Sequence, residues 1–231
     1  MIEIRFWSAA AAALLWTSSA SAADLSGEIG VVSDYRYRGV SLSERNPALQ
    51  ASLTLEHGSG LYVTVWGSTL ERIGRPSSSE VDVTAGYERE FNKWISFDLS
   101  ATRYSYPSAG GDNYSEATAA VTLTRGPASA ILGFSYAPRQ RGLRDDSGRR
   151  RDNSYASLQT AYEVRGMPLT VKAGLGYERG AFDEVERGGK LDWNFGGEAT
   201  RGPAKLSLTY VGSNADGGGR HALVGAVSIG W

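Results

Sequence analysis

The segment Val81-Asp-Val-Thr-Ala-Gly-Tyr-Glu88 alternates apolar and polar side chains with a period of two. Successive side chains of a β-strand point to opposite faces, so this segment predicts a strand with one apolar and one polar face. Similar segments follow one another along the chain, at 61–65, 95–100, 117–123, 130–136, 171–177, 191–195 and 223–231. Between Glu28 and Trp231 we count roughly a dozen, of about ten residues each, which is typical of a transmembrane β-barrel.

The connections between these segments alternate between short and long. The short ones are 58–60, 91–94, 125–127, 165–168 and 201–203, and the long ones are 39–46, 72–78, 107–113, 138–152, 179–189 and 213–220. Outer-membrane barrels have short periplasmic turns and longer extracellular loops. The sequence therefore predicts an all-β fold, an antiparallel up-and-down transmembrane barrel of about 12 strands.

The N-terminal segment has the pattern of a signal peptide. Arg5 precedes an apolar run from Phe6 to Trp16, and small residues follow as far as Ala22. The run is shorter than the roughly 20 residues that a membrane-spanning helix needs, which argues against an anchor. We expect residues 1–22 to be cleaved on export, and residues 23–231 to form one barrel domain in the bacterial outer membrane.

The composition and the C-terminus narrow the range of partners. The chain has no cysteine, and its 24 basic residues nearly balance its 25 acidic ones, so neither thiol chemistry nor nucleic-acid binding is expected. The last residue, Trp231, follows Leu223, Val227 and Ile229 on one face. This ending resembles the signal that the barrel assembly machinery recognises. We expect that machinery, outer-membrane lipids and small solutes as partners.

A soluble barrel or a β-sandwich also alternates, so the outward face must be assigned. Ionisable residues lie within the polar faces, and several apolar faces are thin, as at Ala117 and Ala119. A soluble core needs larger side chains, which favours the membrane barrel. Aromatic residues near strand ends would then form interfacial girdles; we assign to them Tyr35, Tyr37, Tyr87, Tyr136, Tyr177, Trp193 and Trp231.

Several segments resemble a known family. They are Val32 to Ser41, Pro47 to Gln50, Gly60 to Ser68, Glu80 to Tyr87 and Tyr104 to Pro107. The first three resemble the opening of the TorF-type porin family of proteobacteria, also called the Gcw_chp family, and the last two fit the same pattern downstream. The resemblance implies an outer-membrane location and a porin-like role, and it implies neither a substrate nor catalytic residues.

Residues for catalysis or metal binding are sparse. The two histidines, His57 and His221, fall at opposite ends of the predicted barrel, and there is no cysteine. A His-centred catalytic site or a dedicated zinc site therefore has too few members. Residues 214–217 and 145–146 offer oxygen ligands without the full spacing of a calcium loop. We expect no enzyme activity, no metal and no cofactor.

With the apolar faces toward lipid, ionisable residues line the lumen. The candidates are Asp34, Arg36, Arg38, Glu56, Asp82, Glu88, Asp98, Glu116, Asp192 and Glu198. Because carboxylates predominate in the lumen, a channel there would mildly prefer cations. The alternative is that these charges pair and stabilise or plug the barrel, which at about twelve strands is narrow or closed by an inward-folded loop.

The longest predicted loop is rich in arginine. It carries Arg139, Arg141, Arg144, Arg149, Arg150 and Arg151. Guanidinium groups suit phosphate, which favours contact with lipopolysaccharide, while a solvated loop is the alternative. The leading functional expectation is a porin-like channel for passive diffusion of small polar solutes or ions. The alternative is a non-conducting structural or adhesive barrel.

Overall fold

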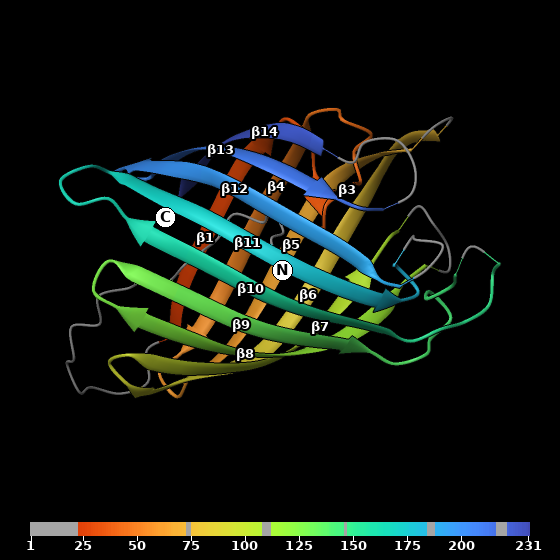
Figure 1. The fold of residues 1–231 in the computed structure, drawn as a ribbon, viewed down its shortest axis with the longest axis horizontal. Coiled ribbons are helices and arrows are strands. Elements are labelled where there is room, and N and C mark those ends of the chain that lie inside the picture. The colour runs from red at the N-terminus through yellow and green to blue at the C-terminus, as the bar shows by residue number, and fades with distance from the viewer. Residues whose placement is uncertain (1–22, 73–74, 108–111, 146, 184–187, 216–220) are drawn as a thin grey trace.

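The protein folds into a closed β-barrel, seen from the side in Figure 1. The structure, a computed structural model, describes residues 23–231 except 73–74, 108–111, 146, 184–187 and 216–220. Twelve of the described strands form the wall, in antiparallel pairs of sequence neighbours. The predicted antiparallel barrel is thereby confirmed. The predicted signal peptide, residues 1–22, lies outside the described residues.

The wall closes because the first strand pairs with both the second and the last wall strand. The wall strands are β1 (Ala23–Val32), β4 (Ala48–His57), β5 (Leu61–Arg72), β6 (Arg75–Asn92), β7 (Ile95–Ser105), β8 (Tyr114–Arg125), β9 (Ala128–Ala137), β10 (Asn153–Glu163), β11 (Leu169–Gly180), β12 (Lys190–Arg201), β13 (Ala204–Ser213) and β14 (His221–Gly230). At one end of the barrel, Trp231 exchanges backbone hydrogen bonds with Gly27, so both ends of the described chain lie there.

The outer face of the barrel is apolar all the way round. Every wall strand exposes large apolar side chains, such as Val63, Leu132 and Leu208. Aromatic side chains are exposed near both ends of the barrel, with Trp94 and Tyr162 at one end and Tyr136 at the other. A continuous apolar surface of this extent, between aromatic margins, suits lipid rather than water. Among the described residues, no helix is long and apolar enough to cross a membrane.

The two ends of the barrel differ in their connections. At the short-turn end the strands are joined by residues 58–60, 93–94, 126–127, 164–168 and 202–203. At the long-loop end they are joined by 33–47, 106–113, 138–152, 181–189 and 214–220. Residues 125–127 and 201–203 both have the sequence Arg-Gly-Pro. Their glycines, Gly126 and Gly202, adopt φ values of 60° and 59°, which allows these sequences to form tight turns.

The β5–β6 connection corrects one prediction. The sequence predicts a loop at 72–78, yet β6 begins at Arg75 and the backbones remain paired up to Arg72 and Arg75. Backbone hydrogen bonds need no apolar face, so an antiparallel ladder can continue after the alternation has ended. The loss of alternation marked the end of the apolar surface and not the end of the strands.

The segment between β1 and β4 corrects a second prediction from the sequence. The wall strand ends at Val32, whereas the sequence predicts that it continues to Arg38 with a loop at 39–46. Residues 33–47, here called the inner segment, contain two short strands, β2 (Arg36–Tyr37) and β3 (Val40–Ser41), paired antiparallel. Positive φ values at Arg38 (47°) and Gly39 (82°) make the turn between them.

The inner segment folds into the barrel interior. Tyr35 is 0% exposed and packs on Trp66 of β5, with ring centroids 5.3 Å apart. Tyr37 is 9% exposed and contacts the ring of Tyr104 on β7. The assignment of both tyrosines to an interfacial girdle is therefore wrong, because they pack inside the wall rather than at its margin. Gly39 lies where a Cβ would collide with Ser213 of β13.

Candidate functional site

Arg38 anchors the inner segment to two separate parts of the wall. One guanidinium nitrogen, Nη1, donates to Oε1 of Glu178 on β11 (2.5 Å), and the other, Nη2, donates to Oε1 of Glu116 on β8 (2.6 Å). Two strands, β9 and β10, stand between β8 and β11 in the wall. A single side chain therefore spans part of the barrel opening. The Arg38 side chain is 0% exposed, which removes these ion pairs from solvent screening.

Further polar groups surround the same carboxylates. Lys190 at the start of β12 lies 2.6 Å from Oε2 of Glu178, and Asn153 donates its amide to Oε1 at 2.8 Å. The Tyr155 ring lies 4.1 Å from the Arg38 guanidinium carbon. We call Arg38, Glu116, Glu178, Lys190 and Asn153 the Arg38 cluster. Buried charges are costly unless they are paired, and Arg38, Glu116, Glu178 and Lys190 each have an oppositely charged partner within 2.6 Å.

A second set of contacts fixes the first half of the inner segment. Arg36 donates from Nε to Oδ2 of Asp34 at 2.6 Å, and the Ser41 hydroxyl donates to Oδ1 at 2.6 Å. The Tyr35 hydroxyl donates to Glu80 on β6 at 2.9 Å. The segment is thus tied to β6 at one point and to β8 and β11 at another.

Apolar packing also fills part of the long-loop end. The rings of Tyr104 and Tyr114 stack with centroids 4.4 Å apart, and Tyr37 meets the edge of this pair. Leu143, from the connection 138–152, is 0% exposed and belongs to the same buried cluster. Side chains of two long connections therefore fill this end of the interior together with the wall.

Small hydroxyl side chains line the middle of the interior. They pair across neighbouring strands at 2.8–2.9 Å as Thr54 with Thr64, Thr84 with Thr102, and Thr118 with Ser135. Gly133 and Gly174 face inward on β9 and β11 at a similar height. Short side chains that satisfy one another project little into the interior at these positions.

Carboxylates gather toward the short-turn end. Glu56 and Glu88 are exposed, and Asp98, opposite Glu88 in the β6–β7 register, is half-buried. Glu198 lies 2.9 Å from Lys172 and both are partly exposed. The charges at this end are therefore accessible, in contrast to the buried Arg38 cluster.

The predicted lumen residues fall into three groups. Asp34, Arg36 and Arg38 belong to the inner segment rather than to a wall strand. Asp82, Glu116 and Asp192 lie on the wall in the long-loop half and are buried, at 1–4% exposure. Glu56, Glu88, Asp98 and Glu198 lie on the wall in the short-turn half.

Sequence reasoning missed several members of the site. Glu178, Asn153 and Tyr155 all contact Arg38 or its partners, and Glu80 receives the Tyr35 hydroxyl. Glu178 follows Tyr177 of an apolar face, so the alternation itself placed it inward. Its proximity to the predicted loop at 179–189 concealed that signal.

The six arginines for which the sequence predicts contact with lipopolysaccharide all lie in the connection 138–152. Arg144 donates to the Gly148 carbonyl (2.8 Å), and Arg149 lies 3.4 Å from Asp145. A hydrogen bond from the Ser147 hydroxyl, helped by Arg149, holds the pKa of Asp145 below its usual range. Arg139, Arg141, Arg144, Arg149 and Arg150 are exposed and Arg151 is partly exposed. The loop thus presents cationic groups at the long-loop end.

The two histidines lie far from each other. His57 ends β4 at the short-turn end, and His221 begins β14 at the long-loop end, where its ring stacks on Tyr210. No cluster of three potential metal ligands occurs within the described part of the chain. The calcium candidates at 145–146 and 214–217 include positions 146, 216 and 217, which lie outside the described residues.

An apolar outer face, a polar interior and alternating short and long connections define the class of the fold as an outer-membrane-type β-barrel. The chain belongs to the Gcw_chp family, described as bacterial protein of unknown function, whose sequence profile matches residues 17–225. That description carries no activity. A comparison with curated proteins gave no match.

Solved structures with a similar fold include two porins and an outer membrane channel. The KdgM porin is 11% identical with a TM-score of 0.62, and the alignment covers 89% of this chain and 98% of that one. The NanC porin is 12% identical with a TM-score of 0.60, covering 90% and 98%. The COG4313 outer membrane channel from Pseudomonas putida F1 is 12% identical with a TM-score of 0.54, covering 90% and 94%. At these identities the likeness is one of fold.

Proposed function

We propose that the protein spans the bacterial outer membrane and lets small polar solutes or ions diffuse through its lumen. The observation that carries this proposal is the contrast between an apolar outer face and an interior of hydroxyls and accessible carboxylates. The long-loop end faces outside, as in barrels of this class. Residues 1–22 direct export, and the strand ending at Trp231 directs insertion by the assembly machinery.

In this proposal the inner segment narrows the outer mouth. The buried Arg38 cluster leaves the long-loop half tightly packed, whereas the short-turn half keeps exposed carboxylates. The same cluster is the observation that favours the second candidate, a non-conducting structural or adhesive barrel. The likeness to the KdgM and NanC porins supports the channel.

Single-channel recording separates the two candidates. The mature chain, residues 23–231, is refolded and added to a planar bilayer. We expect discrete conductance steps of small amplitude, because the outer mouth is narrow. Silence from a protein that remains folded, judged by heat-modifiable migration in electrophoresis, would favour the structural barrel.

We further propose a mild preference for cations, set at the short-turn mouth. The strand alternation places the carboxylates of this rim on the inner face: Asp24, Glu56, Glu88, Glu90 and Glu163. Rings of carboxylates raise the local cation concentration in a pore. The double variant Glu56→Gln with Glu88→Gln should move the reversal potential in a salt gradient toward zero, the value for a non-selective pore. The matched control Arg201→Gln, on the outer face, should leave it unchanged, and anion preference of the unmodified protein would refute the proposal.

Contact with lipopolysaccharide is proposed for the arginines of the connection 138–152. Added lipopolysaccharide should raise the thermal unfolding midpoint of the detergent-solubilised barrel, because phosphate accepts charge-assisted hydrogen bonds from guanidinium. Arg149→Glu with Arg150→Glu should abolish most of that rise. Arg201→Glu, at the opposite end, should preserve it. An equal rise in all three proteins would mean that the loop is only solvated.

A further inference from the structure

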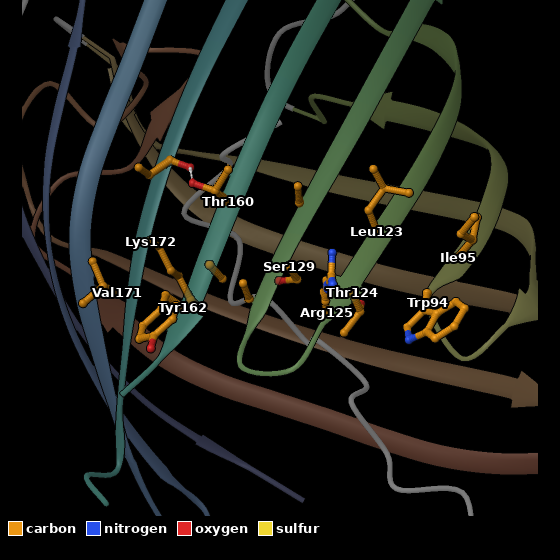
Figure 2. Close-up of a pocket in the computed structure, with 14 residues that line it drawn as sticks. Trp94, Ile95, Leu123, Thr124, Arg125, Ser129, Thr160, Tyr162, Val171 and Lys172 are labelled. Carbon is orange, nitrogen blue, oxygen red and sulfur yellow. Dashed lines mark hydrogen bonds between the residues drawn. The ribbon is translucent and has the colours of Figure 1, made fainter. Parts of the chain in front are cut away.

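The outer face has a hollow near the short-turn end, across β8 to β11 (Figure 2). Its floor consists of small side chains: Ala128, Ala130, Thr160 and Ala173. The Thr160 hydroxyl donates to the Ala173 carbonyl at 3.2 Å, so the floor keeps no unsatisfied hydroxyl. The hollow has a volume of about 920 Å³. That volume is in the range of pockets that hold small molecules, roughly 300–1,000 Å³.

Larger apolar side chains form the walls of the hollow. Trp94 and Ile95 stand on the β7 side, Leu123 on β8, and Tyr162 and Val171 on the β10 and β11 side (Figure 2). Trp94 is 56% exposed and Tyr162 is 49% exposed, so neither is covered by this chain. A small-residue floor between aromatic walls suits a flexible hydrocarbon chain, which can bend to fill the space.

The mouth of the hollow is cationic. Arg125 lines it, and the Lys93 ammonium lies 4.8 Å from the centroid of the Trp94 ring. In the described part of the chain, the outward side chains and turns of this rim also carry Arg89, Arg165 and Arg201. The carboxylates of the rim belong to the inner face instead. The two faces of one rim therefore carry opposite charge, and an anion is attracted to the outer one.

We infer that this hollow binds an anionic phospholipid, with an acyl chain on the alanine floor and the phosphate beside Arg125 and Lys93. The inference rests on the proposed membrane orientation, in which the short-turn end lies in the periplasmic leaflet. A second copy of the chain fits less well. A symmetric pair meeting at this face would bring the cationic rims together, and like charges repel.

Brominated lipids test the site because bromine quenches tryptophan at contact, and Trp94 is a wall residue. The mature protein is placed in phosphatidylcholine vesicles that contain a small fraction of brominated phosphatidylglycerol. The emission of Trp94 is obtained by subtracting the fluorescence of the Trp94→Phe variant from that of the unmodified protein. We expect much stronger quenching of Trp94 than random contact with the small brominated fraction of the lipid would give. Arg125→Gln should lower the enrichment about fivefold, since one cation near an anionic headgroup contributes about 1 kcal/mol.

Filling the floor tests the hollow separately. Ala130→Leu with Ala173→Leu should bring quenching down to that of the bulk lipid. The matched control on the neighbouring face, Ala199→Leu, which keeps every cation of the rim, should leave it unchanged. Equal quenching by brominated phosphatidylcholine and phosphatidylglycerol would overturn the inference. So would protection of Trp94 from both lipids together with a cross-linked dimer, which would show a second copy in the hollow.

Failure of the lipid-site proposal can be distinguished from failure of the channel proposal. Selective quenching in a barrel that carries no current would leave the lipid site standing and refute the channel. Conductance without selective quenching would support the channel and refute the lipid site. A folded barrel that does not enter vesicles at all would overturn both.

Discussion

Arg38→Met is expected to raise the single-channel conductance and to lower the thermal stability of the barrel. The substitution keeps the length of the side chain but removes both charged hydrogen bonds, to Glu116 at 2.6 Å and to Glu178 at 2.5 Å. Lys190 still compensates Glu178, whereas Glu116 loses its ion pair. Removing one partner of a buried pair costs about 3–5 kcal/mol.

A second variant separates closure from stability. In Arg38→Met with Glu116→Gln no carboxylate is orphaned, so much of the lost stability should return. The inner segment still lacks its tie to β8 and β11, so the raised conductance should remain. Arg141→Met, an exposed arginine at the same end, is the matched control and should change neither quantity. If Arg38→Met left the conductance unchanged while it destabilised the barrel, the cluster would be structural only.

The wall of the barrel could be predicted from the sequence, because its signal is local. Residues such as Val81 to Glu88 alternate for a physical reason that holds wherever one face meets lipid and the other meets water. Turn residues add a second local signal, as at Gly126 and Gly202, which take left-handed backbone conformations. Both signals need only a few consecutive residues, so strands and connections were placed close to their observed positions.

The inner segment could not be predicted in the same way. Asp34 to Arg38 alternates like a wall strand, and part of it is indeed a strand, β2, but its partner is β3 and not the wall. Alternation reports two faces and does not tell which surfaces they meet. The pairing of Arg38 with Glu116 and Glu178 joins residues 78 and 140 positions apart, so it exists only once the barrel has closed.

Charge at the short-turn rim shows how one sequence serves two environments. Even-numbered positions of β6, such as Glu88, face the lumen, and the odd-numbered Arg89 faces outward. Because neighbouring residues of a strand point to opposite faces, a Glu-Arg dipeptide is enough to separate the charges. Cation preference in the lumen and attraction of anionic lipid outside then follow from the same stretch of chain and can be changed independently.

Replacing residues 33–47 by an Asn-Gly turn is expected to give the largest increase in conductance of any single change. Val32 and Ala48 are direct partners in the β1–β4 register, so a two-residue hairpin turn can join them without altering the wall. The carboxylates of Glu116 and Glu178 would then face a water-filled lumen rather than a packed interior, which limits the loss of stability relative to Arg38→Met.

The matched control shortens another loop at the same end. Arg144 and Arg150 form an isolated β-bridge, so the residues between them can be replaced by Gly-Gly while Leu143 stays in place. That variant should conduct like the unmodified protein. A barrel without its inner segment that folds, migrates heat-modifiably and still conducts no more than the intact chain would place the constriction elsewhere. Because the segment contributes no strand to the wall, conductance in this variant reports on the lumen alone.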